Sequence, residues 1–327
     1  MLNLFRNNSI FAFVFLIVFA VLIRLLPFLV NVPIDLNINA PLAQVTFNWI
    51  TTFDNYYYFS AVSASFFVFL EAWLVNHIVA KHSILNKDSF LPALFFVLLN
   101  SLYPQQLFLS PQLIGNLFVI FMFYRLCNLY EAERPLYIVL DSGLYLGLAV
   151  LFNYDTLVYL PFILISVVLM TYFNIRFLLA SVFGILLPIY LLCVLFFLND
   201  NLNDLIIIVN KSLERTYLNQ IKFNWIKLIP WILITVIVLL SGISLQTNYF
   251  KNKVKTRRIL FTVALFIAIS ILLVLIEDHN IVFGICYLAV PVSIIMANYF
   301  ISSRLAILKE TFFFLMIAAA IVYQYFI

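Results

Sequence analysis

Residues 24–55, RLLPFLVNVPIDLNINAPLAQVTFNWITTFDN, connect the first two long apolar stretches of the chain. The segment begins with an arginine, Arg24, at the end of an apolar run, and it holds two acids, Asp35 and Asp54. Its prolines interrupt helix continuity, because proline lacks the backbone N–H that a helix interior needs. A charged group beside apolar sequence and a break in helix pattern make this segment the first place to search for a functional site.

The composition around this segment is that of an integral membrane protein. The 327-residue chain is 65% hydrophobic and 10% charged, and its mean hydropathy is +1.11. Soluble domains are about 25% charged. Apolar windows of about 20 residues alternate with short charged turns, as in transmembrane helices, whereas the strands of a membrane barrel are about 10 residues long and alternate apolar with polar positions. We therefore predict an all-α, polytopic transmembrane protein.

The apolar windows predict about eleven spans. If the N-terminus is cytoplasmic, 13 of the 18 Lys and Arg residues fall on the cytoplasmic side, including the run KNKVKTRR at 251–258. This distribution obeys the positive-inside rule and predicts that the C-terminus lies outside. The approximate spans are 9–30, 56–80, 90–108, 112–130, 137–153, 156–173, 177–198, 224–245, 257–276, 280–300 and 311–327.

Two outer connections are too long to be simple turns, at 31–55 and 199–223. In the first, Leu42, Val45, Trp49 and Phe53 recur at helical spacing, which predicts a short amphipathic helix lying in the membrane interface. The second has a similar helical pattern and carries Lys211 and Arg215. We expect both connections to flank a cavity on the outer side.

Ionisable residues within or near the spans are functional candidates, because charges at membrane depth are costly. Arg24 either reaches the outer headgroups or binds a lipid phosphate or Asp35. Glu71 and His77 lie six residues apart, so they do not share a helix face, and a Glu71 bonded to a neighbouring helix is the simpler interpretation. Asp141 and Arg176 fall near the cytoplasmic ends of their spans, where an acid such as Asp141 favours a helix N-terminus.

Motifs of known catalytic and metal sites are absent from the sequence. It contains no GxSxG, phosphate loop or HExxH, and its three histidines are not paired at metal-ligand spacing. Cys127, Cys193 and Cys286 lie in apolar spans without CxxC spacing, as small core residues do. The basic residues occupy short turns and form no separate face, so we expect neither a metal nor a nucleic-acid partner.

In layout the chain resembles the GT-C superfamily of polytopic glycosyltransferases. The resemblance covers about the first 200 residues: NVPIDLN with Asp35, the interfacial run 41–53, YPQQLFLSPQLIGNLFVIF at 103–121, and GLYLGLAVLFNYDTLVYLPFILI at 143–165. It implies a GT-C-like module at 1–198 with its long first outer loop at 31–55, an outer amphipathic loop at 199–223, and a C-terminal four-span module at 224–327.

Two segments are also similar to an uncharacterised family of bacterial polytopic inner-membrane proteins. They are YRLCNLYEAERPLYIVLDSGLYLGLAVLF, which contains Asp141, and YFNIRFLLASVFGILLPIY, which contains Arg176. Both polar residues match positions of that family on the cytoplasmic side. The similarity implies a location in the bacterial cytoplasmic (inner) membrane.

The GT-C resemblance also implies specific roles for residues. Asp35 would be the general base, and Arg24, Lys211 and Arg215 would hold the phosphate of a polyprenyl-linked sugar donor. A divalent metal or the polyprenyl-phosphate lipid would be the cofactor only in that case; otherwise we expect none. Asp35 lacks the adjacent second acid that many members of the superfamily carry.

Three functional hypotheses follow. The sparse acids favour a non-catalytic membrane subunit that binds lipids or other membrane and envelope proteins in a complex. The alternative is a polyprenyl-phosphate-sugar-dependent glycosyltransferase with an outer-facing active site. A transporter is the second alternative, although the halves of the chain show no internal similarity of the kind that marks many transporters.

Overall fold

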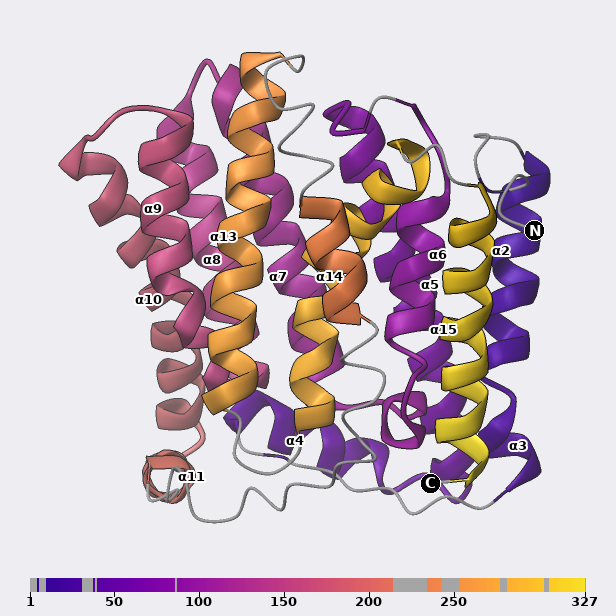
Figure 1. Cartoon of the computed structure of the whole chain (residues 1–327). Helices are drawn as coiled ribbons and strands as arrows, with labels where there is room; N and C mark the ends of the chain where they lie inside the picture. The colour runs from indigo at the N-terminus through magenta and orange to yellow at the C-terminus, as the bar shows by residue number, and fades with distance from the viewer. Residues whose placement is uncertain are drawn as a thin grey trace.

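The computed structural model is all-helical over the residues it describes, and its helices stand side by side in one bundle (Figure 1). These residues are 5, 10–30, 38, 40–85, 87–213, 234–242, 253–276, 281–302 and 306–326. The helices are α2 (Ile10–Ile23), α3 (Leu26–Leu29), α4 (Pro41–Ile50), α5 (Tyr56–Lys81), α6 (Leu91–Leu99), η1 (Pro104–Leu107), α7 (Pro111–Asn128), η2 (Leu129–Glu131), α8 (Pro135–Phe152), η3 (Tyr154–Tyr159), α9 (Leu160–Met170), α10 (Ile175–Leu198), α11 (Leu202–Leu213), α13 (Val254–Ile276), α14 (Ile281–Ser302) and α15 (Ala306–Phe326).

Six helices in the described part of the chain are long and apolar enough to cross a membrane, namely α5, α7, α8, α10, α13 and α14. The shorter apolar helices include α2 and the η3–α9 pair. Many large apolar side chains are exposed on the outside of the bundle, including Phe183, Leu186 and Tyr190 of α10. Contiguous apolar surface of this extent suits a lipid environment. The prediction of a helical membrane protein is confirmed, while the count of eleven spans and the GT-C arrangement stay predictions.

Proline marks where many helices begin. Helices α3, α4, α6, α7, α8 and α9, together with η1, carry proline in their first two positions. Proline suits these positions because its fixed φ matches the helix and its missing N–H would have no partner there. The boundaries between apolar helices are therefore largely set by proline.

Helix α14 forms the centre of the bundle. Within its apolar window Val282–Ile301, 94% of the residues are buried, and it packs against α6, α7 and α13. The rings of Phe95 on α6 and Phe300 on α14 lie 4.6 Å apart. A helix that is apolar on all sides suits a core position.

Helix α6 is shorter than the span predicted at 90–108. It ends at Leu99, an irregular segment follows, and η1 begins at Pro104. Asn100 and Ser101, which follow the helix, are fully buried. The last carbonyl groups of a helix have no partners within it, so the break places backbone acceptors inside the protein.

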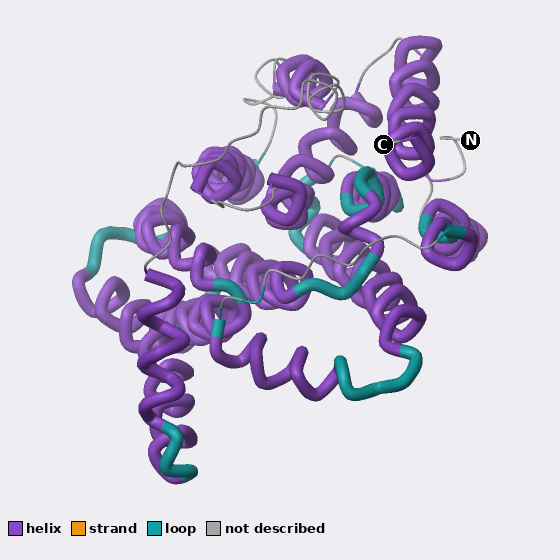
Figure 2. The backbone as a smooth tube through the Cα atoms, turned by 90° about the horizontal axis from the view of Figure 1, so that it is seen from below, coloured by secondary structure: helices purple, strands orange, loops and turns teal. Residues whose placement is uncertain are grey.

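Helices α4 and α11 lie across the same end of the bundle (Figure 1). The view from below shows α4 running in the plane of the picture, beneath the ends of the longer helices (Figure 2). The helix predicted near 41–53 is therefore present. Ala43 and Phe47 face the bundle and are buried, whereas Val45 and Trp49 of the predicted apolar stripe are exposed, as a helix in the membrane interface requires.

Helices α8 and α10 are in backbone contact through glycine. A Cβ atom added to Gly184 would lie 2.4 Å from the carbonyl oxygen of Leu140, and one added to Gly143 would lie 2.3 Å from that of Ser181. Gly147 similarly faces Ile185. Small residues four apart allow such close approach of membrane helices, and this GLYLG spacing was not recognised as a packing signal from the sequence.

We predict that Gly184→Ala destabilises the protein by about 1–3 kcal/mol, because the added methyl group forces the two backbones apart. Gly242→Ala is the matched control, since a Cβ there meets nothing within 4 Å; alanine also favours helix over glycine. Thermal unfolding of the purified proteins in mild detergent measures both effects. Equal melting temperatures for the two variants would contradict the proposed contact.

Candidate functional site

Arg24 lies inside the bundle, where its side chain is 2% exposed. Its guanidinium donates hydrogen bonds to Ser65 Oγ on α5 at 3.2 Å and to Ser101 Oγ at 3.2 Å. It also donates to the backbone carbonyls of Asn100 and Gln106, both at 2.8 Å. The side chain therefore binds the broken end of α6.

Two glutamines extend this cluster to the C-terminal helices. The side-chain amide of Gln106 donates to the carbonyl of Val282 on α14 at 3.0 Å, and that of Gln324 on α15 donates to the carbonyl of Ser101. Residues from the two ends of the chain thus meet at the α6 break. All of these hydrogen bonds join groups within the chain, which points to a structural role for Arg24.

Replacing Arg24 with methionine leaves two buried carbonyls without these donors. We predict a loss of roughly 2–6 kcal/mol in stability, from a cost of about 1–3 kcal/mol per unsatisfied buried group. Arg176→Met is the control, because Arg176 is exposed at the start of α10 and should change stability by less than about 0.5 kcal/mol. Denaturation in mild detergent tests this, and similar stabilities for the two variants would refute the structural role.

Glu71 is fully buried between α5 and α7. One carboxylate oxygen accepts a hydrogen bond from the side-chain amide of Asn116 at 2.9 Å. His77 lies on another face of α5, is exposed, and stacks on Trp73. Glu71 and His77 therefore lie apart. The partner of Glu71 is Asn116, which the sequence had not suggested.

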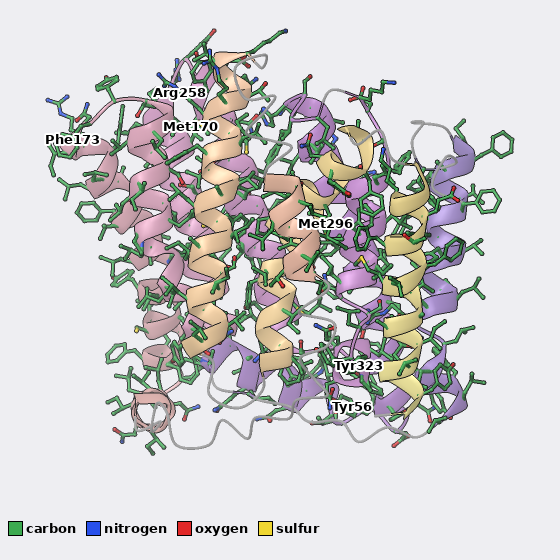
Figure 3. All side chains as sticks on the ribbon, viewed as in Figure 1. Tyr56, Met170, Phe173, Arg258, Met296 and Tyr323 are labelled. Carbon is green, nitrogen blue, oxygen red and sulfur yellow. The ribbon has the colours of Figure 1, made fainter. Side chains whose placement is uncertain are left out.

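Charged side chains gather at the end of the bundle opposite α4. Lys255 at the start of α13 pairs with Glu131 at 2.7 Å. Arg258 donates to the carbonyl of Met170 at 3.1 Å, and Figure 3 shows these two residues together, whereas Tyr56 and Tyr323 lie at the other end. The basic residues predicted to be cytoplasmic from the 251–258 run therefore share one end with Glu131.

His82 caps α5 at this charged end and is buried. Burial, followed by the positive charges of Lys255 and Lys81, lowers the pKa of His82 from its ordinary 6.5 to about 4. The folded protein therefore favours the neutral ring. The contribution of neutral His82 to the free energy of unfolding is fully present above pH 6.5 and is lost as pH falls through about 4.

We predict that His82→Phe flattens the fall in melting temperature of the protein between pH 6.5 and 4, because the phenyl ring fills the site without taking up a proton. His77→Phe, which changes an exposed histidine, should keep the wild-type slope. Melting curves across this pH range measure both. A wild-type slope in the His82 variant would show that another group causes the acid sensitivity.

A groove of about 420 Å³ lies between α8, α10 and α4, with one residue of α7 at its edge. Its α8 wall contains Leu144, Leu148 and Leu151, which follow Asp141 at helical spacing. The α10 wall begins at Leu187 and Pro188, next to the glycine contact, and continues along the helix. In full, the lining residues are Leu42, Arg125, Asp141, Leu144, Tyr145, Leu148, Leu151, Leu187, Pro188, Leu191, Leu192 and Leu195.

One end of the groove is charged. Arg125 Nη2 and Asp141 Oδ2 form an ion pair at 3.1 Å, with the side chains 37% and 33% exposed. Asp141 lies in the second turn of α8 and pairs with α7, so its role is more than favouring the helix N-terminus. Arg176, which the sequence grouped with Asp141, is not part of this pair.

Several predicted site residues cannot be placed. Asp35 and Arg215 lie outside the described residues, and only the backbone of Lys211 is described. The expected convergence of Asp35 with Arg24 and a basic residue of 199–223 therefore stays a prediction. Over the described ranges, no group of three or more His, Cys, Asp or Glu side chains lies close enough to hold a metal.

Comparison of the chain with protein-family models, with curated proteins and with solved structures finds no match. Function must therefore be argued from the geometry of these sites.

Sequence reasoning missed both the groove and the polar partners. Arg125, Gln112 and Asn116 were not predicted as site residues from the sequence. Gln112 and Asn116 are polar residues four apart in an apolar run, which puts them on one helix face. That spacing could have revealed the buried polar face of α7 that meets Glu71.

Proposed function

We propose that this chain is an integral membrane protein with a non-catalytic role, in which the α8–α10 groove holds one hydrocarbon chain of a membrane lipid. The observation that carries the proposal is the groove itself, which has eight leucines along its walls and an ion pair at one end. Its volume falls in the range of roughly 300–1,000 Å³ typical of small-molecule sites.

The groove faces the apolar outside of the bundle. Leu187, Leu191 and Leu195 of its α10 wall are exposed, as are neighbouring residues of the same helix that lie outside the groove. A lipid chain can thus enter sideways from the hydrocarbon region. Close packing against the leucines would favour it, since packing, and not water exclusion, drives association within a membrane.

A role as a subunit of a bacterial inner-membrane assembly fits the same features. The basic residues at one end support a cytoplasmic N-terminus and an outer C-terminus. Helices α4 and α11 lie together at the other end, and this shared placement supports a GT-C-like layout with interfacial helices. The glycosyltransferase and transporter hypotheses stay alternatives; of the four residues proposed for the first, only Arg24 has a described side chain, and it binds backbone carbonyls of the protein.

We predict that Leu191→Trp reduces the lipid that co-purifies with the protein several-fold, because the larger side chain fills the groove. Leu186→Trp is a matched control: both leucines lie on α10 and are half exposed, at 52% and 51%, but only Leu191 lines the groove. Native mass spectrometry of the proteins from mild detergent gives the lipid count. Equal lipid retention by the two variants would sink the proposal.

A further inference from the structure

The ion pair at the charged end of the groove leaves most of its hydrogen-bonding capacity unused. Arg125 and Asp141 share a single contact, and neither side chain makes another hydrogen bond within the described residues. A guanidinium has five N–H donors and a carboxylate about four acceptor sites. Both groups therefore retain free donors and acceptors at the mouth of the groove.

These free groups have opposite charges and lie next to each other. A ligand that satisfies both must present an anion to Arg125 and a cation to Asp141. The remaining lining is apolar apart from Tyr145, so the charged part of such a ligand belongs at this end. Arginine is well suited to phosphate, because its planar N–H groups form paired hydrogen bonds with phosphate oxygens.

We infer that the groove selects phospholipids whose headgroup carries both a phosphate and an ammonium group with N–H donors, as in phosphatidylethanolamine. The phosphate binds Arg125, and the ammonium donates to Asp141. This inference rests on the proposed lipid-binding function and adds the identity of the headgroup. A purely anionic headgroup would satisfy Arg125 but would place negative charge against Asp141.

The dimensions of the groove agree with this arrangement. Asp141 and Leu151 are ten residues apart on α8, which corresponds to about 15 Å. An acyl chain can therefore follow α8 and α10 over this length, with its headgroup at the ion pair.

The test is competitive lipid binding to the full-length protein, measured by native mass spectrometry. The probes are phosphatidylethanolamine, phosphatidylcholine and phosphatidylglycerol with identical acyl chains. We expect binding to decrease in that order, since the choline ammonium has no N–H to donate and glycerol has no cation. Asp141→Asn should reduce the preference for phosphatidylethanolamine over phosphatidylglycerol about tenfold, the effect of losing a hydrogen bond to a charged group.

Glu131→Gln is the matched control, because Glu131 forms an ion pair at the same end of the bundle but outside the groove; it should keep the wild-type preference. The double variant Arg125→Asp/Asp141→Arg retains one charge of each sign and should recover preference relative to Asp141→Asn. That recovery separates headgroup recognition from a folding defect.

The outcomes distinguish the two proposals. If Leu191→Trp lowers lipid retention but the wild-type protein binds all three lipids equally, the groove proposal stands and headgroup selection is wrong. Selection is also wrong if Glu131→Gln shifts the preference as much as Asp141→Asn. If Leu191→Trp retains as much lipid as wild type, the groove proposal fails, and headgroup selection fails with it.

Discussion

The structure depends on a buried positive charge that meets the buried end of a helix. Arginine inside a membrane protein must be surrounded by acceptors, and a helix that ends inside a bundle must find donors for its last carbonyls. Arg24 and the α6 break at Asn100 meet both requirements at once. Because Gln106 and Gln324 join the same cluster, this contact also fixes how the first helices sit against α14 and α15.

The groove lies outside the Arg24 cluster, and its shape depends on how α8 packs against α10. Gly143 and Gly184 bring α8 and α10 into backbone contact at one level. Pro188, inside α10, follows that contact and itself lines the groove; a proline within a helix bends it. The α8–α10 pair is therefore closely packed at the glycines and forms an open apolar wall along the groove.

The sequence was sufficient for the helical class, for the presence of helix α4 and for the charged end, because these follow from apolar length, helical spacing and charge. It was insufficient for the partners of Arg24, two of which are backbone carbonyls 76 and 82 residues away that have no residue signature. The α6 break was also missed, although Asn100, Ser101 and Pro104 interrupt the apolar run at that point. The pairing of Arg125 with Asp141 depended on the packing of α7 against α8, which no local pattern specifies.

The Arg24 cluster also imposes an order on biogenesis. At a synthesis rate of about 5–20 residues per second, Gln106 is made roughly 4–16 s after Arg24, and Gln324 roughly 15–60 s after it. Until Gln324 is synthesised, the Ser101 carbonyl lacks its donor from α15. Helix α15, which is synthesised after α2 and α6, thus completes a polar cluster that Arg24 begins, and a chain truncated before Gln324 lacks that part of the cluster.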